Sequence, residues 1–185
     1  MAMKKFPHFE FVQHSKYPIP EGLKAECGYL TVPESRSTSS GNFPGNRTLG
    51  IYVTLVKSLN ENPTLDPIVF LYGGPGGNSG GILKGLEAAE VQDLLLSQSD
   101  FIVFDHRGTG FSEPTLFAPE VDPLWSDAFL KDIDADERAG RFVEAMLKAR
   151  ARYVNEGINL AAINTPEIAS DLNDLRLALG YEKLK

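Results

Sequence analysis

Residues 67–77 read PIVFLYGGPGG, and residues 101–112 read FIVFDHRGTGFS, which has the same order of an apolar run followed by glycines. Each stretch begins with a nearly continuous apolar run, which is typical of a strand covered on both faces of a sheet. Each then enters a glycine-rich loop. Parallel α/β sheets carry their chemistry at the carboxyl ends of strands, where glycine lets the backbone approach a ligand. The two stretches therefore predict parallel strands whose glycine loops form a candidate site.

The segments around these strands predict an α/β fold. A helical stretch around residues 82–96 joins the strands 67–71 and 101–104, which makes a βαβ unit with a right-handed crossover. Before it, residues 28–32 and 49–56 are typical of strands, separated by a polar, turn-forming connection. We expect an antiparallel pair, followed by parallel strands with crossover helices.

The chain divides into four parts of one domain. Residues 1–26 form a proline-punctuated arm, residues 27–115 the sheet with its glycine loops, and residues 116–163 a helical segment. In that segment, residues 122–155 predict one or two amphipathic helices. Residues 164–185 hold a final helix. Its features are Thr165 as cap, Pro166 in the first turn, an apolar stripe of Ile168, Leu172, Leu175 and Leu179, and Gly180 as its end.

The final helix is followed by very few residues. In an α/β sheet such a helix normally returns the chain to the sheet, and here only five residues come after Gly180. We therefore expect the chain to be part of a longer molecule.

Composition limits the classes of function. The 185 residues are 42% apolar and 23% charged, as in a soluble globular protein, and the net charge is −7. No clustered basic face is present, which argues against nucleic-acid binding. No apolar run is long enough to span a membrane or to act as a secretory signal, so we expect a cytoplasmic protein. Cys27 is the only cysteine, which excludes an internal disulfide.

The first glycine loop has several interpretations. A dinucleotide fingerprint requires a glycine at its sixth position, where Ser79 stands, and Pro75 removes a backbone donor. Asp105 could mimic the ribose-binding acid, so a nucleotide-binding α/β protein remains an alternative. Residues 77–81 match the Gly-x-Ser-x-Gly nucleophile elbow, but they begin too far after the strand and have no suitable histidine or acid. We expect Ser79 to lie at a helix start instead.

An oxyanion-binding role suits the same loop better. Backbone N–H groups around Gly73, Gly74 and Gly76 could point at the oxyanion that develops during acyl transfer. The competing interpretation is a tight glycine turn that binds nothing.

The second glycine loop is expected to be structural. Gly108 and Gly110 allow the turn, Arg107 can pair with a buried carboxylate such as Asp105, and Ser112 can cap the next segment. His106 could act as a base, but a lone histidine beside a strand end is more often structural.

One further acidic motif, residues 132–143, resembles a calcium loop. It lacks the required glycine and the bidentate glutamate. We expect a solvated helix start there, and no metal or cofactor.

Four motifs, taken in order, resemble the α/β-hydrolase fold, and specifically the proline iminopeptidase and tripeptidyl aminopeptidase group of serine exopeptidases. They are CGYLTVP at 27–33, GGPGG at 73–77, DHRGTGFS at 105–112, and the final helix with its flanks from Asn164 to Tyr181. In that family the first glycine loop is usually His-Gly-Gly-Pro-Gly, and here Tyr72 replaces the histidine. The resemblance implies that Gly74 supplies an oxyanion-hole N–H.

The resemblance also implies a set of elements beyond this chain. A strand would begin near Leu184, then a Gly-x-Ser-x-Gly elbow, a lid, and the catalytic aspartate and histidine. None of the triad is in this chain, so the chain alone is expected to be inactive. Its partners would be a peptide or small ester or amide substrate and the C-terminal half of the same fold. The alternative is a noncatalytic binding module or inactive remnant, whose bare sheet edge could self-associate.

Overall fold

The protein folds around one mixed sheet of five strands. The computed structural model describes residues 7–36, 47–73, 77–125 and 133–185. The strands are β1 (His8–Val12), β2 (Ala25–Pro33), β3 (Thr48–Val56), β4 (Ile68–Leu71) and β5 (Phe101–Phe104). Their order in the sheet is β1-β2-β3-β5-β4. The chain is thus an α/β protein, as the apolar runs predict.

Strand pairing agrees with the predicted pattern. β2 and β3 are antiparallel, as expected, and β4 and β5 are parallel, with Leu71 opposite Phe104. β5 also pairs with β3, in the antiparallel sense. The N-terminal arm contributes more than expected, because its residues 8–12 form β1 along the outer edge of β2. Phe9 and Phe11 alternate there with His8 and Glu10, which is the two-residue period of a strand over a very short run.

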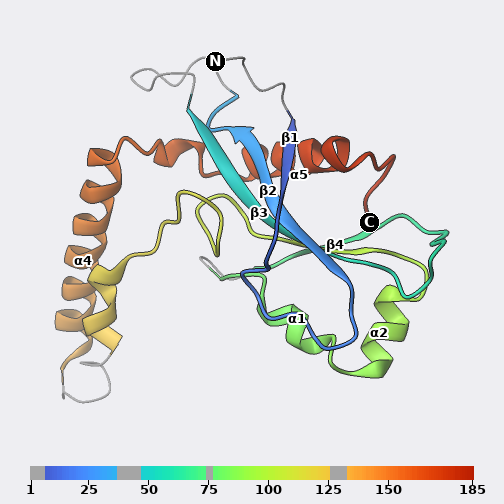
Figure 1. Ribbon diagram of the computed structural model, residues 1–185. Helices are drawn as coiled ribbons and strands as arrows, with labels where there is room; N and C mark the ends of the chain where they lie inside the picture. Colours follow the sequence, from blue (N-terminus) through green and yellow to red (C-terminus); the bar gives the residue numbers. More distant parts are fainter. Residues whose placement is uncertain (1–6, 37–46, 74–76, 126–132) are drawn as a thin grey trace.

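Helices cover both faces of the sheet (Figure 1). On one face, α1 (Gly81–Gly85), the turn after it and α2 (Ala89–Leu96) bury Leu83, Leu86 and Leu96 against Val56, Phe101 and Val103. On the other face, α5 (Thr165–Leu179) packs Leu175 against Ile51, Val53, Ile102 and Phe104. Alternate residues of β5 therefore serve opposite cores, as the two-residue period of a strand requires.

Two local predictions about the helices need correction. The expected helix over 82–96 is two helices, separated by residues 86–88. Thr165 does not cap α5, because Asn164 is the extended residue before the helix and its side chain accepts the N–H of Glu167. The apolar stripe of α5 packs on the sheet as predicted, and Gly180 ends the helix with a φ of 77°.

The segment between β5 and α5 lies beside the sheet. It contains a short 3-10 turn, η1 (Pro119–Val121), helical residues 122–125, α4 (Ala135–Asn155) and a second 3-10 turn, η2 (Leu160–Ala162). In Figure 1, α4 stands at one end of the molecule, away from the five strands. This segment has a small core of its own, in which Leu116, Ala118 and Leu160 pack against the buried Ala149, Tyr153 and Ile158.

Candidate functional site

The two glycine loops leave the sheet at the same edge. Because β4 and β5 are parallel neighbours in register, the residues after Leu71 and after Phe104 start side by side. Tyr72 and Gly73 are exposed there, and the Tyr72 ring contacts Phe70. Gly74 and Gly76 of the expected oxyanion loop lie outside the described residues, so their role stays a prediction.

Asp105 connects both loops to the N-terminal arm. Its side chain is buried, and one carboxylate oxygen accepts the N–H of Ser79 at 2.9 Å. The other oxygen accepts the Tyr17 hydroxyl at 2.7 Å and the N–H of Phe111 at 2.9 Å. Burial, reinforced by the hydrogen bond to Asp105, raises the pKa of Tyr17 far above its ordinary value. Tyr17 therefore remains a proton donor to this carboxylate at any physiological pH.

The second glycine loop is closed by hydrogen bonds. Gly108 and Gly110 have φ values of 81° and 53°, and a Cβ on Gly110 would overlap the Asp105 carboxylate. The Ser112 hydroxyl donates to the carbonyl of Asp105 at 2.9 Å and accepts the N–H of Tyr52 at 3.0 Å. Ser112 therefore ties the loop to β3, and the expectation that it caps the next segment is wrong.

Arg107 lies on the other side of the loop, facing α5. Its buried guanidinium donates to both carboxylate oxygens of Asp171, at 2.7 Å each. It also donates to the carbonyls of Glu34 at 2.6 Å and Ala162 at 2.9 Å. Arg107 thus pairs with a buried carboxylate, as expected, but the partner is Asp171 and not the suggested Asp105, whose oxygens accept from Tyr17, Ser79 and Phe111. Such a bidentate pair fixes where α5 sits relative to β5.

A second arginine extends this cluster toward the surface. Arg36 donates to Asp171 at 2.8 Å, to Asp174 at 2.6 Å and to Glu167 at 2.6 Å. The three carboxylates all belong to α5. We call Arg36, Arg107, Glu167, Asp171 and Asp174 the arginine cluster. It joins the end of β2, the second glycine loop and α5 into one unit.

His106 is half-buried beside the Phe104 ring, and its Nε2 has no hydrogen-bond partner among the described residues. Burial lowers the pKa of His106, although Asp105 acts in the opposite direction. His106 is therefore neutral at physiological pH. The Ser79 hydroxyl donates to a backbone carbonyl rather than to this ring, and the structural role expected from the sequence remains the simplest description.

A cavity of about 660 Å³ lies against the second glycine loop and the segment that follows it, and it reaches the far end of the first loop. The first loop contributes Asn78, and the second contributes Gly108 to Phe111. The remaining wall is mainly apolar and includes Leu116, Phe117 and Ile163. A space of this size, lined by glycine backbone, apolar side chains and a few polar residues, is suited to a small organic ligand or a few residues of a peptide.

Ser79 has no nucleophile geometry. Its side chain is buried, and its hydroxyl donates to the carbonyl of Phe104 at 2.9 Å. It stands just before α1, close to the predicted helix start. Because α1 has only five residues, its N-terminus provides little of the dipole that a nucleotide phosphate would require.

The described residues offer neither a metal site nor a membrane span. Within these ranges, no group of three or more His, Cys, Asp or Glu side chains could hold a metal ion. The acidic motif at residues 132–143 falls partly outside them, and its Asp134 caps α4 by accepting the N–H groups of Asp136 and Glu137. Among the described helices, none has the length and apolar character needed to cross a bilayer.

Two residues that shape the site, Asp171 and Tyr17, are not among those predicted from the sequence. Asp171 carried a usable signal, since it stands three residues after Ile168 and four before Leu175, on the buried stripe of α5. A charged residue at such a position predicts a buried partner. Tyr17 gave no signal, because its contact with Asp105 joins residues that are distant in the sequence.

Comparison with known proteins points to peptidases. Tripeptidyl aminopeptidases of Streptomyces lividans and Streptomyces coelicolor are each 29% identical to this chain over 168 residues. The match covers 86% of this chain and 29% of each relative, so the chain spans less than a third of their length. No family model matches. The two matches support a relationship to peptidases, and nothing finer.

Proposed function

We propose that this chain is the N-terminal part of a serine hydrolase, an exopeptidase that releases N-terminal residues from peptides through an acyl-enzyme. The observation that carries the proposal is the match to two tripeptidyl aminopeptidases over most of the chain but only 29% of their length. In this proposal, the sheet of this chain is the N-terminal part of an α/β-hydrolase fold.

The geometry of the glycine loops supports this function. Both loops leave the same sheet edge, and the cavity against the second loop also includes Asn78 at the end of the first loop. In the proposed enzyme, the N–H of Gly74 donates to the oxyanion of the tetrahedral intermediate, with Gly73 and Gly76 shaping the loop. A preorganised donor of this kind contributes about 3 kcal/mol to transition-state stabilisation.

The last residue of the chain supports a continuation of the sheet. Lys185 donates its N–H to the carbonyl of Pro67 at 2.9 Å, and its own carbonyl accepts the N–H of Val69 at 2.9 Å. These two bonds flank Ile68 and have the pattern of a parallel ladder. The proposed nucleophile strand would continue from Lys185 along β4, which carries it toward the edge with both glycine loops.

The test uses the natural protein, recovered with an antibody raised against this chain. Its intact mass, its labelling by a fluorophosphonate serine probe and its release of N-terminal peptides are measured together. We expect a mass well above that of 185 residues, and a labelled serine downstream of Lys185. The 185-residue chain alone is the matched control and should remain unlabelled. A natural product of 185 residues that takes no label would overturn the proposal.

The free edge of β4 favours a second candidate function, a noncatalytic binding module. β4 pairs with β5 on one side, and in the described structure only Lys185 pairs with its other side. An extended peptide could add there as a parallel strand. In that case the natural protein would be short and unreactive toward the probe. It would bind peptides whose affinity falls in Leu71→Pro, because Leu71 is the next residue after Val69 that faces the edge and Lys185 pairs only around Ile68.

A further inference from the structure

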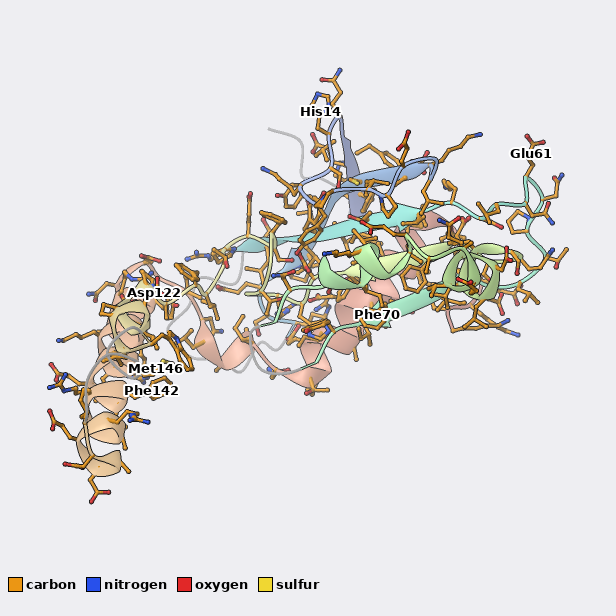
Figure 2. The ribbon with its side chains drawn as sticks, turned by 90° about the horizontal axis from the view of Figure 1, so that it is seen from below. His14, Glu61, Phe70, Asp122, Phe142 and Met146 are labelled. Atoms are coloured by element: carbon orange, nitrogen blue, oxygen red, sulfur yellow. The ribbon has the colours of Figure 1, made fainter. Side chains whose placement is uncertain are left out.

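α4 has an apolar face that the described structure leaves bare. One stripe of the helix, Ala145, Ala149 and Tyr153, is buried against the rest of the molecule. The adjoining stripe carries larger side chains that remain in solvent, with Val143 56%, Met146 42% and Leu147 59% exposed. Figure 2 shows Phe142 and Met146 beside α4, at the end of the molecule remote from Glu61. An amphipathic helix normally buries such a face.

A line of three residues runs along this bare face. Asp136, Val143 and Arg150 are spaced seven residues apart, so they lie on nearly the same side of the helix. Asp136 and Arg150 are both exposed, and neither takes part in an ion pair within the described residues. The other charges of α4 lie mainly on the opposite side, where Glu137 pairs with Arg141 and Glu144 with Lys148.

We propose that this face docks a second copy of the same chain, with the two α4 helices antiparallel and crossing at Val143. In this register each Asp136 meets the Arg150 of the other copy, so the pair forms twice. A parallel arrangement would place Asp136 beside Asp136 and Arg150 beside Arg150. Charged residues at seam positions select orientation in this way.

Side-chain size supports the same register. Residues equally distant from Val143 on either side face each other, so Leu147 of one copy lies opposite Ala139 of the other. Met146 lies opposite Gly140, where a Cβ would meet nothing within 4 Å. Large side chains thus face small ones, which lets the helices approach closely. At the start of α4, a cavity of about 420 Å³ lined by Leu124, Trp125 and Phe142 adds further apolar surface.

The experiment is sedimentation velocity on the 185-residue chain over a concentration series. We expect a reversible dimer that Arg150→Asp weakens at least tenfold, because two acids then meet at each end of the seam. Asp136→Arg should weaken it similarly, and the double variant Asp136→Arg/Arg150→Asp should restore it to within about threefold. Lys148→Asp is the control, since it makes the same charge change on the opposite side of α4. Circular dichroism establishes that each variant keeps its fold.

Recovery in the double variant supports this interface, because a general loss of folding or a change in net charge would not be reversed. A chain that stays monomeric at all concentrations overturns the proposal. A dimer whose affinity is unchanged in the Asp136 and Arg150 variants but lost in Leu71→Lys also overturns it, because the contact would then be made by β4. Protection of the bare face from hydrogen exchange in a longer, monomeric natural form also overturns it, because a segment of the same chain would then be the occupant.

Discussion

β4 and β5 are two strands of similar sequence with different surroundings. Both are four-residue apolar strands that end in a glycine loop. All four residues of β5 are buried, and it has a neighbouring strand on each side. In β4, three residues are half-buried and Leu71 is exposed. Apolar composition therefore identifies a strand, but it does not say how many neighbours the strand has.

The loops after the two strands differ in the same way. The loop after β5 is held by Asp105, by Ser112 and by Arg107, all buried. The loop after β4 begins with Tyr72 and Gly73 in solvent, and the bond from Ser79 to Asp105 anchors its far end. One loop is held by buried polar groups, and the described start of the other is exposed. Substitutions in the two regions therefore test this difference.

The largest effect is expected from Arg107→Met. The substitution leaves Asp171 without the bidentate arginine and removes donors from two buried carbonyls, although Arg36 still contacts the carboxylate. We expect a loss of about 3–5 kcal/mol in the free energy of unfolding, measured with urea. Arg138→Met, at an exposed residue near the start of α4, is the control, with an effect within about 0.5 kcal/mol. A loss below about 1 kcal/mol for Arg107→Met would mean that the arginine cluster is not an anchor.

Asp105→Asn should release both loops at once. The amide cannot accept all three donors that the carboxylate accepts, so a buried donor loses its partner. We expect a loss of about 2–4 kcal/mol and faster hydrogen exchange at the amides of Ser79 and Phe111. Asp93→Asn, on the exposed side of α2, should change neither quantity. Unchanged exchange at both amides in Asp105→Asn would contradict the assignment of Asp105 as the common anchor.

Two valine substitutions compare the packing of β4 with that of β5. Val103→Ala removes methyl groups from a position that is 1% exposed, whereas Val69→Ala does so on the half-buried edge strand. We expect a loss of about 2 kcal/mol for Val103→Ala and under about 1 kcal/mol for Val69→Ala, from urea unfolding. Equal losses would show that β4 is as well packed as β5. In a longer natural protein with a strand beside β4, the two losses should converge.

The smallest effect concerns the pH dependence of stability at His106. Burial lowers its pKa in the folded chain below the ordinary 6.5, so the unfolded chain binds the proton first as the pH falls. Stability is therefore lost as the pH drops through about 6.5, by at most about 1.4 kcal/mol per pH unit. His106→Gln should flatten this limb between about pH 7.5 and 5.5 in thermal unfolding. His14→Gln, an exposed histidine (Figure 2), should leave it unchanged. A steeper limb in His106→Gln would mean that folding raises the pKa of His106 instead.

Local elements could be predicted from the residues alone. Apolar runs located β2, β3, β4 and β5 to within a few residues, because a buried strand must be apolar whatever its partner. The stripe of α5 and the left-handed Gly180 followed from helical spacing and from the freedom of glycine. The two glycine loops at one edge followed from parallel pairing. These features depend on interactions among residues that are close in the chain, so a short stretch of sequence is enough to predict them.

Which polar groups meet is a matter of tertiary structure. Asp105 binds Tyr17 from 88 residues away, and Arg107 binds Asp171 from 64 residues away. A pattern of residue types cannot choose between Asp105 and Asp171 as the partner of Arg107, because both are acids and the choice depends on which side of β5 each one occupies. The exposure of β4 and the bare face of α4 were likewise undecided by their apolar residues. Burial depends on what packs against a segment, and that is a property of the whole fold.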